Sequence, residues 1–286
     1  MHHQAHPSIA PIELLARIEQ STHLFFDVDR TLVQNQGVIP ERLLALLQNC
    51  DKACGIATSR CRSEAEEIVS GTGHALRGLF SGPIVLEDGA LAILPGSERT
   101  QLLIPVEAHM PVMSLATALV RKLERVDGEA TWRRFPSLEA PLVQMPEGYE
   151  ASSTIWEKGP AGCPDFAHVM ALVRGQAEAL GVSEAVQLLE IGDGTLRITV
   201  PGISKGSALQ QLHEEGVLDL EKVVYFGDGH NDIPAAHVVR KGGGTVVAVD
   251  HHCQELMQLA SHVTPLGLTG PSAVTAILAS YLATQP

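Results

Sequence analysis

The chain has 286 residues, a formal net charge of −13 and a hydrophobic fraction of 45 %. This length suggests one large or two moderate domains, and the hydrophobic fraction is sufficient for a buried core, which excludes a mainly disordered chain. The acidic charge excludes nucleic acid and anionic membranes as main partners, although a local positive pocket for an anionic substrate remains compatible with it.

The cysteines are five in number and have no Cys-x-x-Cys spacing. We therefore expect reduced thiols, without disulfide or metal roles, and a cytoplasmic location. No apolar stretch reaches the roughly 18 residues that a membrane span needs, and no signal peptide is recognisable, so we expect no membrane partner. The sequence leaves the oligomeric state open.

Strands and helices are predicted to alternate in the first part of the chain. The predicted strands are residues 24–26, 53–57 and 83–86, and the predicted helices are residues 12–20, 40–47 and 63–69. Asp88-Gly89 stands between two apolar runs, which predicts a hairpin that continues over residues 91–94.

From about Pro95 the pattern changes. We predict helices at 112–126 and 166–180, and a hairpin of residues 186–191 and 196–200 that turns at Gly192-Asp193-Gly194. After Pro201 the alternation returns, with helices at 205–215, 231–238 and 272–282 and strands at 223–226 and 244–249.

This alternation predicts an α/β fold with a doubly wound, mostly parallel sheet. Residues 1–94 and 202–286 together are expected to form this core. Residues 95–201 are then an inserted α+β domain.

Doubly wound sheets bind ligands at the carboxyl ends of their strands, so the residues that follow each apolar run are the candidate site. These are Asp27, Asp29 and Thr31; Thr58, Ser59 and Arg60; and Gly227 to Asp232, with Lys205 at a predicted helix start. Carboxylate oxygens suit Mg²⁺ better than zinc. Hydroxyl groups, a lysine and a helix amino terminus suit a phosphoryl group.

These segments, in this order, resemble the motifs of the haloacid dehalogenase (HAD) superfamily of aspartate-nucleophile phosphatases. The matching residues are Asp-x-Asp-x-Thr at 27–31, the hydroxyl of Thr58, Lys205, and Gly-Asp-x-x-Asn-Asp at 227–232. An insertion between the second and third motifs resembles the branch with a large α/β cap, which includes Cof-type and sucrose-phosphate-phosphatase-like sugar phosphatases. Segments 85–90 and 198–206 also resemble the sequences that flank the cap in that branch.

The resemblance implies that Asp27 attacks phosphorus and becomes an aspartyl phosphate, while Asp29 protonates the leaving oxygen and then activates water. It implies an Mg²⁺ ion held by Asp27, Asp228 and the backbone carbonyl of Asp29, with Asp232 directly or through water. The implied phosphate-binding residues are Thr58, Ser59, Lys205 and Asn231. Two positions depart from the pattern: Arg30 stands where many members have glycine, and Ser59 stands where Thr-Gly-Arg is common.

Three other readings compete. A phosphomutase uses the same aspartyl-phosphate chemistry, and only an activity assay separates the two. A two-component receiver also uses Asp, Thr or Ser, and Lys, but it is shorter and carries its phosphorylated Asp after a middle strand. A non-catalytic metal- or phosphate-binding protein requires a broken motif, and all four motifs are intact. We therefore expect an Mg²⁺-dependent phosphatase of a sugar phosphate or another small phosphorylated metabolite, with the inserted domain setting specificity.

Overall fold

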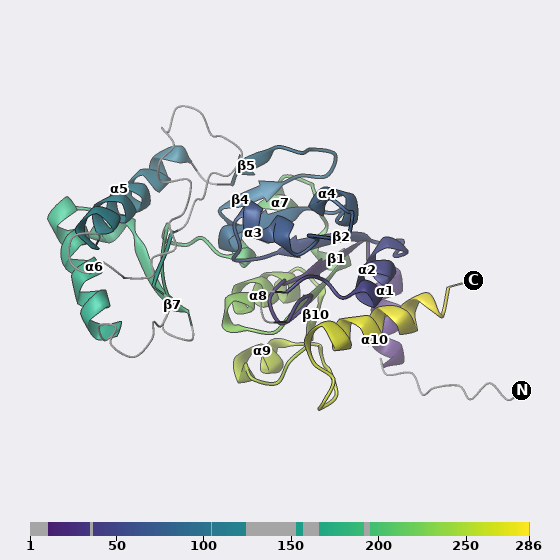
Figure 1. The fold of residues 1–286 in the computed structure, drawn as a ribbon. Coiled ribbons are helices and arrows are strands. Elements are labelled where there is room, and N and C mark those ends of the chain that lie inside the picture. The colour runs from purple at the N-terminus through teal and green to yellow at the C-terminus, as the bar shows by residue number, and fades with distance from the viewer. Residues whose placement is uncertain are drawn as a thin grey trace, which may run out of the picture. The chain divides into compact units, whose positions relative to one another are not determined.

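The computed structural model describes residues 11–34, 37–103, 105–123, 153–156, 166–191 and 195–285 (Figure 1). The chain divides into two compact units, which we call the core unit and the inserted unit. The core unit is Met1–Gln101 with Ser204–Pro286, and the inserted unit is Leu102–Ile203.

The core unit is built on one sheet of eight strands, most of them parallel. In chain order the strands are β1 (His23–Phe26), β2 (Ala53–Ala57), β3 (Ile84–Leu86), β4 (Leu91–Ile93), β5 (Thr100–Leu102), β9 (Val223–Gly227), β10 (Thr245–Ala248) and β11 (His262–Val263). Their order across the sheet is β11-β10-β9-β1-β2-β3-β4-β5. Neighbouring strands are parallel from β11 to β3, and β4 is antiparallel to β3. The predicted doubly wound, mostly parallel sheet is thus confirmed, and β5 extends it by residues that the sequence analysis assigned to the insertion.

The helices of the core unit form two groups. One contains α1 (Ile12–Gln20), α2 (Glu41–Gln48) and α10 (Gly270–Leu282), and the other contains α7 (Lys205–Glu214), α8 (Ile233–Lys241) and α9 (Gln254–Leu259). Helix α10 contacts α1 and α2, while α8 contacts α7 and α9. Figure 1 shows β10 between α8 and α10, as expected for a sheet covered on both faces. Two shorter helices, α3 (Arg62–Glu67) and α4 (Leu76–Leu79), follow β2.

The centre of the sheet is apolar on both faces, as the run Leu24-Phe25-Phe26 predicted. All three side chains are fully buried. Phe26 lies opposite Phe226 of the neighbouring strand, and their rings stack with centroids 4.9 Å apart. This pairing brings together two strands from opposite halves of the sequence, and the residues that follow each strand therefore lie next to each other.

The inserted unit has its own sheet and its own core. It contains α5 (Val106–Leu123), α6 (Phe166–Leu180) and an antiparallel sheet in the order β6 (Ser153–Trp156), β8 (Thr195–Thr199), β7 (Gln187–Ile191). The helices pack on a cluster formed by Val112, Leu115, Leu119, Val173, Ala177, Val186, Ile198 and Val200. Strands β7 and β8 pair as the predicted hairpin requires, and the predicted turn at 192–194 lies outside the described residues. Helix α5 begins earlier than predicted, at Val106.

Within the described part of the chain, the structure contains no helix with the length and apolar character needed to cross a bilayer.

Gly206 sets how closely α7 and α8 pack. A Cβ atom at this position would lie 2.3 Å from the carbonyl oxygen of Pro234. We expect Gly206→Ala to reduce the free energy of unfolding by about 1–3 kcal/mol, because the backbone of α8 must shift to admit the methyl group. Circular dichroism during urea unfolding measures this. The control is Gly78→Ala in α4, where an added Cβ atom would meet no other group within 4 Å. A small gain in stability is expected for this variant. Equal stability of the two variants would contradict the packing argument.

Candidate active site

Three buried carboxylates meet at the carboxyl edge of the core sheet. Asp27 follows β1, Asp228 follows the adjacent strand β9, and Asp232 lies in the next turn of chain. Each offers one oxygen to a group whose atoms lie within 4.8 Å of one another. The three residues are at most 5 % exposed. Because carboxylates repel in a buried environment, such a cluster needs positive charge among its neighbours.

Lys205 supplies positive charge to this cluster. It is the first residue of α7, whose N-cap is Ser204, and it is fully buried. Its Nζ donates hydrogen bonds to Oδ1 of Asp27 at 2.5 Å and to Oδ1 of Asp232 at 2.7 Å. Burial lowers the pKa of Lys205, but the two carboxylates outweigh this effect and raise the pKa above its ordinary value. Lys205 is therefore a permanent cation at the centre of the site.

Asp232 is held by four donors and is the anchor of the cluster. Its Oδ1 accepts from Lys205 and, at 2.6 Å, from the hydroxyl of Tyr225. Its Oδ2 accepts from the backbone N–H groups of Asp228 and Gly229 at 2.9 and 3.0 Å. A carboxylate has about four lone-pair sites, so these bonds satisfy it. Residue 227 must be glycine here, since a Cβ atom would lie 2.7 Å from the Asp232 carboxylate.

The other two carboxylates are poorly neutralised. Burial raises the pKa of Asp27 well above its ordinary value, with Lys205 opposing the shift and Asp232 and Asp228 adding to it. Burial and Asp232 raise the pKa of Asp228 to about 6. Thr31, which is fully buried, donates from Oγ1 to Oδ1 of Asp228 at 3.4 Å. One ammonium group against three carboxylates leaves an excess of negative charge, and a divalent cation that prefers oxygen ligands fits this donor set.

Asp29 has a partner of its own. Arg60 donates from Nε to Oδ2 of Asp29 at 3.1 Å and from Nη2 to Oδ1 at 2.7 Å. The guanidinium is fixed in turn, because its Nη1 donates to the carbonyl of Glu64 at 2.9 Å and the residue is only 8 % exposed. The Asp29 side chain is 42 % exposed. A bidentate pair sets the plane as well as the position of the carboxylate.

The predicted phosphate-binding residues lie at the same edge of the sheet. Thr58 follows β2 and is fully buried, and its Oγ1 accepts from the backbone N–H of Arg60 at 3.1 Å. Ser59 and Asn231 are half-buried. Among the described residues, neither of these two side chains hydrogen-bonds to the three carboxylates, whereas Lys205 bonds two of them directly.

Three residues at this site received no role from sequence reasoning: Arg60, Tyr225 and His252. Arg60 was among the residues expected at the strand ends, so its place was indicated but its partner was not. Tyr225 lies within β9, where an apolar run gives no sign that its hydroxyl reaches Asp232. His252 follows β10, and its Nε2 lies 3.4 Å from Oδ2 of Asp228. Each of these contacts depends on how two side chains are oriented in the folded protein, which the sequence does not indicate.

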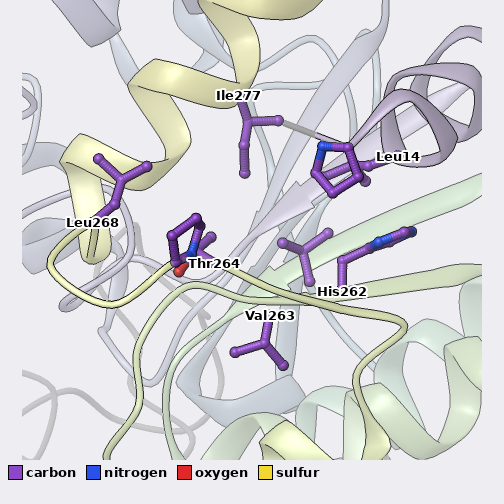
Figure 2. Close-up of a pocket in the computed structure, with 9 residues that line it drawn as sticks. Leu14, His262, Val263, Thr264, Leu268 and Ile277 are labelled. Atoms are coloured by element: carbon purple, nitrogen blue, oxygen red, sulfur yellow. The ribbon is translucent and has the colours of Figure 1, made fainter. Parts of the chain in front are cut away.

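A pocket lies beside β11, the outermost strand on the side of the sheet opposite β5. Figure 2 shows it bounded by Leu14, His262, Val263, Thr264, Leu268 and Ile277. Its lining is mostly apolar, and burial lowers the pKa of His262. None of the predicted site residues lines this pocket. The carboxylates, the lysine and the hydroxyl group of the predicted site lie instead beside β1 and β9.

The comparison of sequences gives one family. Residues 177–267 match the family profile of haloacid dehalogenase-like hydrolases. No curated protein sequence matches the chain.

Solved structures extend the likeness to most of the chain. A protein from Plasmodium vivax classed as HAD/COF-like has a TM-score of 0.62 at 16 % identity, over 95 % of this chain and 100 % of its own. Trehalose-6-phosphate phosphatase from Aspergillus fumigatus has 0.56 at 17 %, over 95 % and 97 %. BT4131, a sugar phosphatase of HAD subclass IIB, has 0.53 at 17 %, over 92 % and 98 %. The resemblance to the haloacid dehalogenase superfamily is therefore confirmed, in sequence over residues 177–267 and in fold over more than nine tenths of the chain.

Proposed function

We propose that this protein is an Mg²⁺-dependent phosphomonoester hydrolase that acts through an aspartyl phosphate on Asp27. The observation that carries the proposal is the buried cluster of Asp27, Asp228 and Asp232 around Lys205. Such a cluster does not serve the stability of the fold, because buried carboxylates cost free energy unless they are paired. A site that binds a cation and a phosphoryl group accounts for all four side chains.

The residues present fit Mg²⁺. Asp27 and Asp228 would hold the ion through their carboxylates, and Asp29 through its backbone carbonyl. Asp232 would act through water, because protein donors already occupy its carboxylate oxygens. When bound, the ion would offset the repulsion between the Asp27 carboxylate and the phosphate dianion and would stabilise charge in the transition state.

Asp27 is the group that attacks. One carboxylate oxygen forms a bond to phosphorus as the bond to the ester oxygen breaks, which leaves a mixed anhydride on Asp27. Lys205 holds the other side of this carboxylate and presents its charge to the phosphoryl oxygens. Thr58, Ser59 and Asn231 would supply further donors to those oxygens. Water then attacks phosphorus and restores the carboxylate.

Asp29 would move the protons. It gives a proton to the leaving oxygen in the first step and takes one from water in the second. Arg60 keeps its carboxylate in place between the two steps. Protonation removes the charge of the Asp29 carboxylate, so both hydrogen bonds from Arg60 are weaker while Asp29 holds a proton. Arg60 is thus a positioning residue.

The substrate proposed is a sugar phosphate or a similar small phosphorylated metabolite. Two of the structural neighbours are described as sugar or trehalose-6-phosphate phosphatases, which supports this class. We propose that the inserted unit acts as a cap that contacts the leaving group and sets specificity, as lids do in enzymes that protect a reactive intermediate from bulk water.

The nucleophile is tested by Asp27→Asn. We expect wild-type protein to release phosphate from a panel of sugar phosphates when Mg²⁺ is present and to release none in EDTA. The variant should release none under either condition, because an amide cannot form the anhydride. The matched control is Asp219→Asn, which changes an exposed aspartate at the N-terminus of the short 3-10 helix Leu220–Lys222. This variant should retain activity. Wild-type protein that releases no phosphate from any ester would contradict the proposal. Turnover that appears only with a bisphosphate activator would indicate the mutase instead.

Asp228→Asn separates stability from metal binding. At pH 7.5 the ionised carboxylate opposes folding, because its folded pKa of about 6 exceeds the ordinary 3.8, and this penalty vanishes only as the pH falls below 3.8. In EDTA we expect the variant to be more stable than wild type by roughly 3 kcal/mol. Added Mg²⁺ should raise the melting temperature of wild type but not of the variant. A variant that is less stable than wild type in EDTA would overturn the electrostatic argument.

Arg60→Met tests the positioning of Asp29. For an alkyl phosphate we expect kcat/KM to fall about 10²-fold, since the leaving alkoxide needs a well-placed acid. For p-nitrophenyl phosphate the fall should be much smaller, because nitrophenolate leaves without a proton. Arg60→Lys should restore only part of the loss, as lysine cannot make the bidentate pair. Arg42→Met, which removes an exposed arginine of α2, is the control. An equal fall for both esters would indicate a structural role only.

A further inference from the structure

Two basic side chains from different parts of the chain meet beside the carboxylate cluster. Nη1 of Arg30 lies 3.5 Å from Nε2 of His252. The same ring nitrogen lies 3.4 Å from Oδ2 of Asp228. Arg30 is therefore two contacts away from a residue that lines the proposed phosphate site. Neither Arg30 nor His252 has a part in the mechanism described above.

The backbone of Arg30 is held in a defined conformation. Its φ is 60°, a conformation that glycine and asparagine adopt more readily than arginine. Its N–H donates to the carbonyl of Val33 at 2.8 Å. Its carbonyl packs against Gly270, where a Cβ atom would lie 2.5 Å from the oxygen. An arginine thus occupies a position whose backbone geometry suits a smaller residue, in a loop held at both ends.

The second basic group is held from another side. His252 follows β10, and its Nδ1 lies 3.4 Å from Oδ1 of Asp250. Strands β1 and β10 are separated only by β9 in the sheet, so the segments that follow them reach the same edge. The side chain of His252 is 36 % exposed and Arg30 is exposed, whereas Asp228 and Thr31 are buried. The pair therefore lies between the buried acidic cluster and solvent.

We propose that Arg30 and His252 form a subsite for a second anionic group of the substrate. On the proposed function, which this inference takes as its basis, the phosphoryl group lies at Asp27, and the subsite would receive a carboxylate or a second phosphate from the same molecule. A guanidinium forms planar, paired hydrogen bonds with either group. The substrate class is then a phosphate ester that carries a second negative charge, such as a phosphorylated sugar acid.

Pairs of ligands that differ in one group give the test. Glycerol 3-phosphate and 3-phosphoglycerate form a short pair, and glucitol 6-phosphate and 6-phosphogluconate form a longer one. In each pair a CH₂OH group becomes a carboxylate. Dissociation constants are measured by calorimetry with Mg²⁺ in the Asp27→Asn background, where no turnover consumes the ligand. This measurement does not need hydrolysis, so it is independent of whether wild-type protein hydrolyses these esters.

We expect the acid of at least one pair to bind more tightly than its alcohol, and Arg30→Gly to reduce that preference about tenfold, the effect of losing one charge-assisted hydrogen bond. Glycine suits the φ of residue 30, and Arg30→Asn is a second variant compatible with it. Arg42→Ala, an exposed arginine of α2, should leave the preference unchanged. The proposal is overturned if neither acid is preferred, or if Arg30→Gly weakens acid and alcohol equally. In the second case, Arg30 only offsets the charge of the carboxylates.

Discussion

The pairing of Lys205 with Asp27 and Asp232 is the interaction on which the rest of the site depends. Lys205 and Asp27 are 178 positions apart in the sequence, yet their side chains share a short hydrogen bond in a fully buried place. A buried ammonium and a buried carboxylate each cost several kcal/mol to desolvate, and each is tolerable only because the other is there. This mutual requirement aligns the start of α7 with the end of β1. It also leaves two carboxylates short of positive charge, which is the property that suits the site to a cation and an anionic substrate.

Much of the core fold could be predicted from the sequence because its signals are local. The run Leu24-Phe25-Phe26 is a buried strand, and the parallel sheet follows from strands that alternate with helices. The convergence of Asp27 and Asp228 follows from one further rule, that strand ends meet at one edge. Strands β5 and β11 were not predicted, since each is short and its residues have no alternating pattern. Their pairing is a consequence of the neighbouring strand, not of their own sequence.

The pairings of the site side chains could not be predicted, for a different reason. Sequence position shows that Asp29 and Arg60 lie at neighbouring strand ends, but not that the guanidinium faces that carboxylate with two donors. The bond from Tyr225 to Asp232 depends on the turn from 227 to 232 folding back over β9. The meeting of Arg30 with His252 depends on a loop packed against Gly270. Such contacts are tertiary, and residue type alone is silent about them.

The parallel pairing of β1 with β9 also bears on how the protein is made. His23 pairs with Val223, so about 200 residues must be synthesised between one strand and its neighbour, which at ribosomal rates takes roughly 10–40 s. During that time β1, β2 and β3 can assemble, but one edge of β1 has no partner. That edge belongs to the apolar centre of the sheet, where unpaired strands associate readily with other chains. The period between the two halves of the core unit is thus when the nascent chain is most prone to aggregation, and when a chaperone has most to protect.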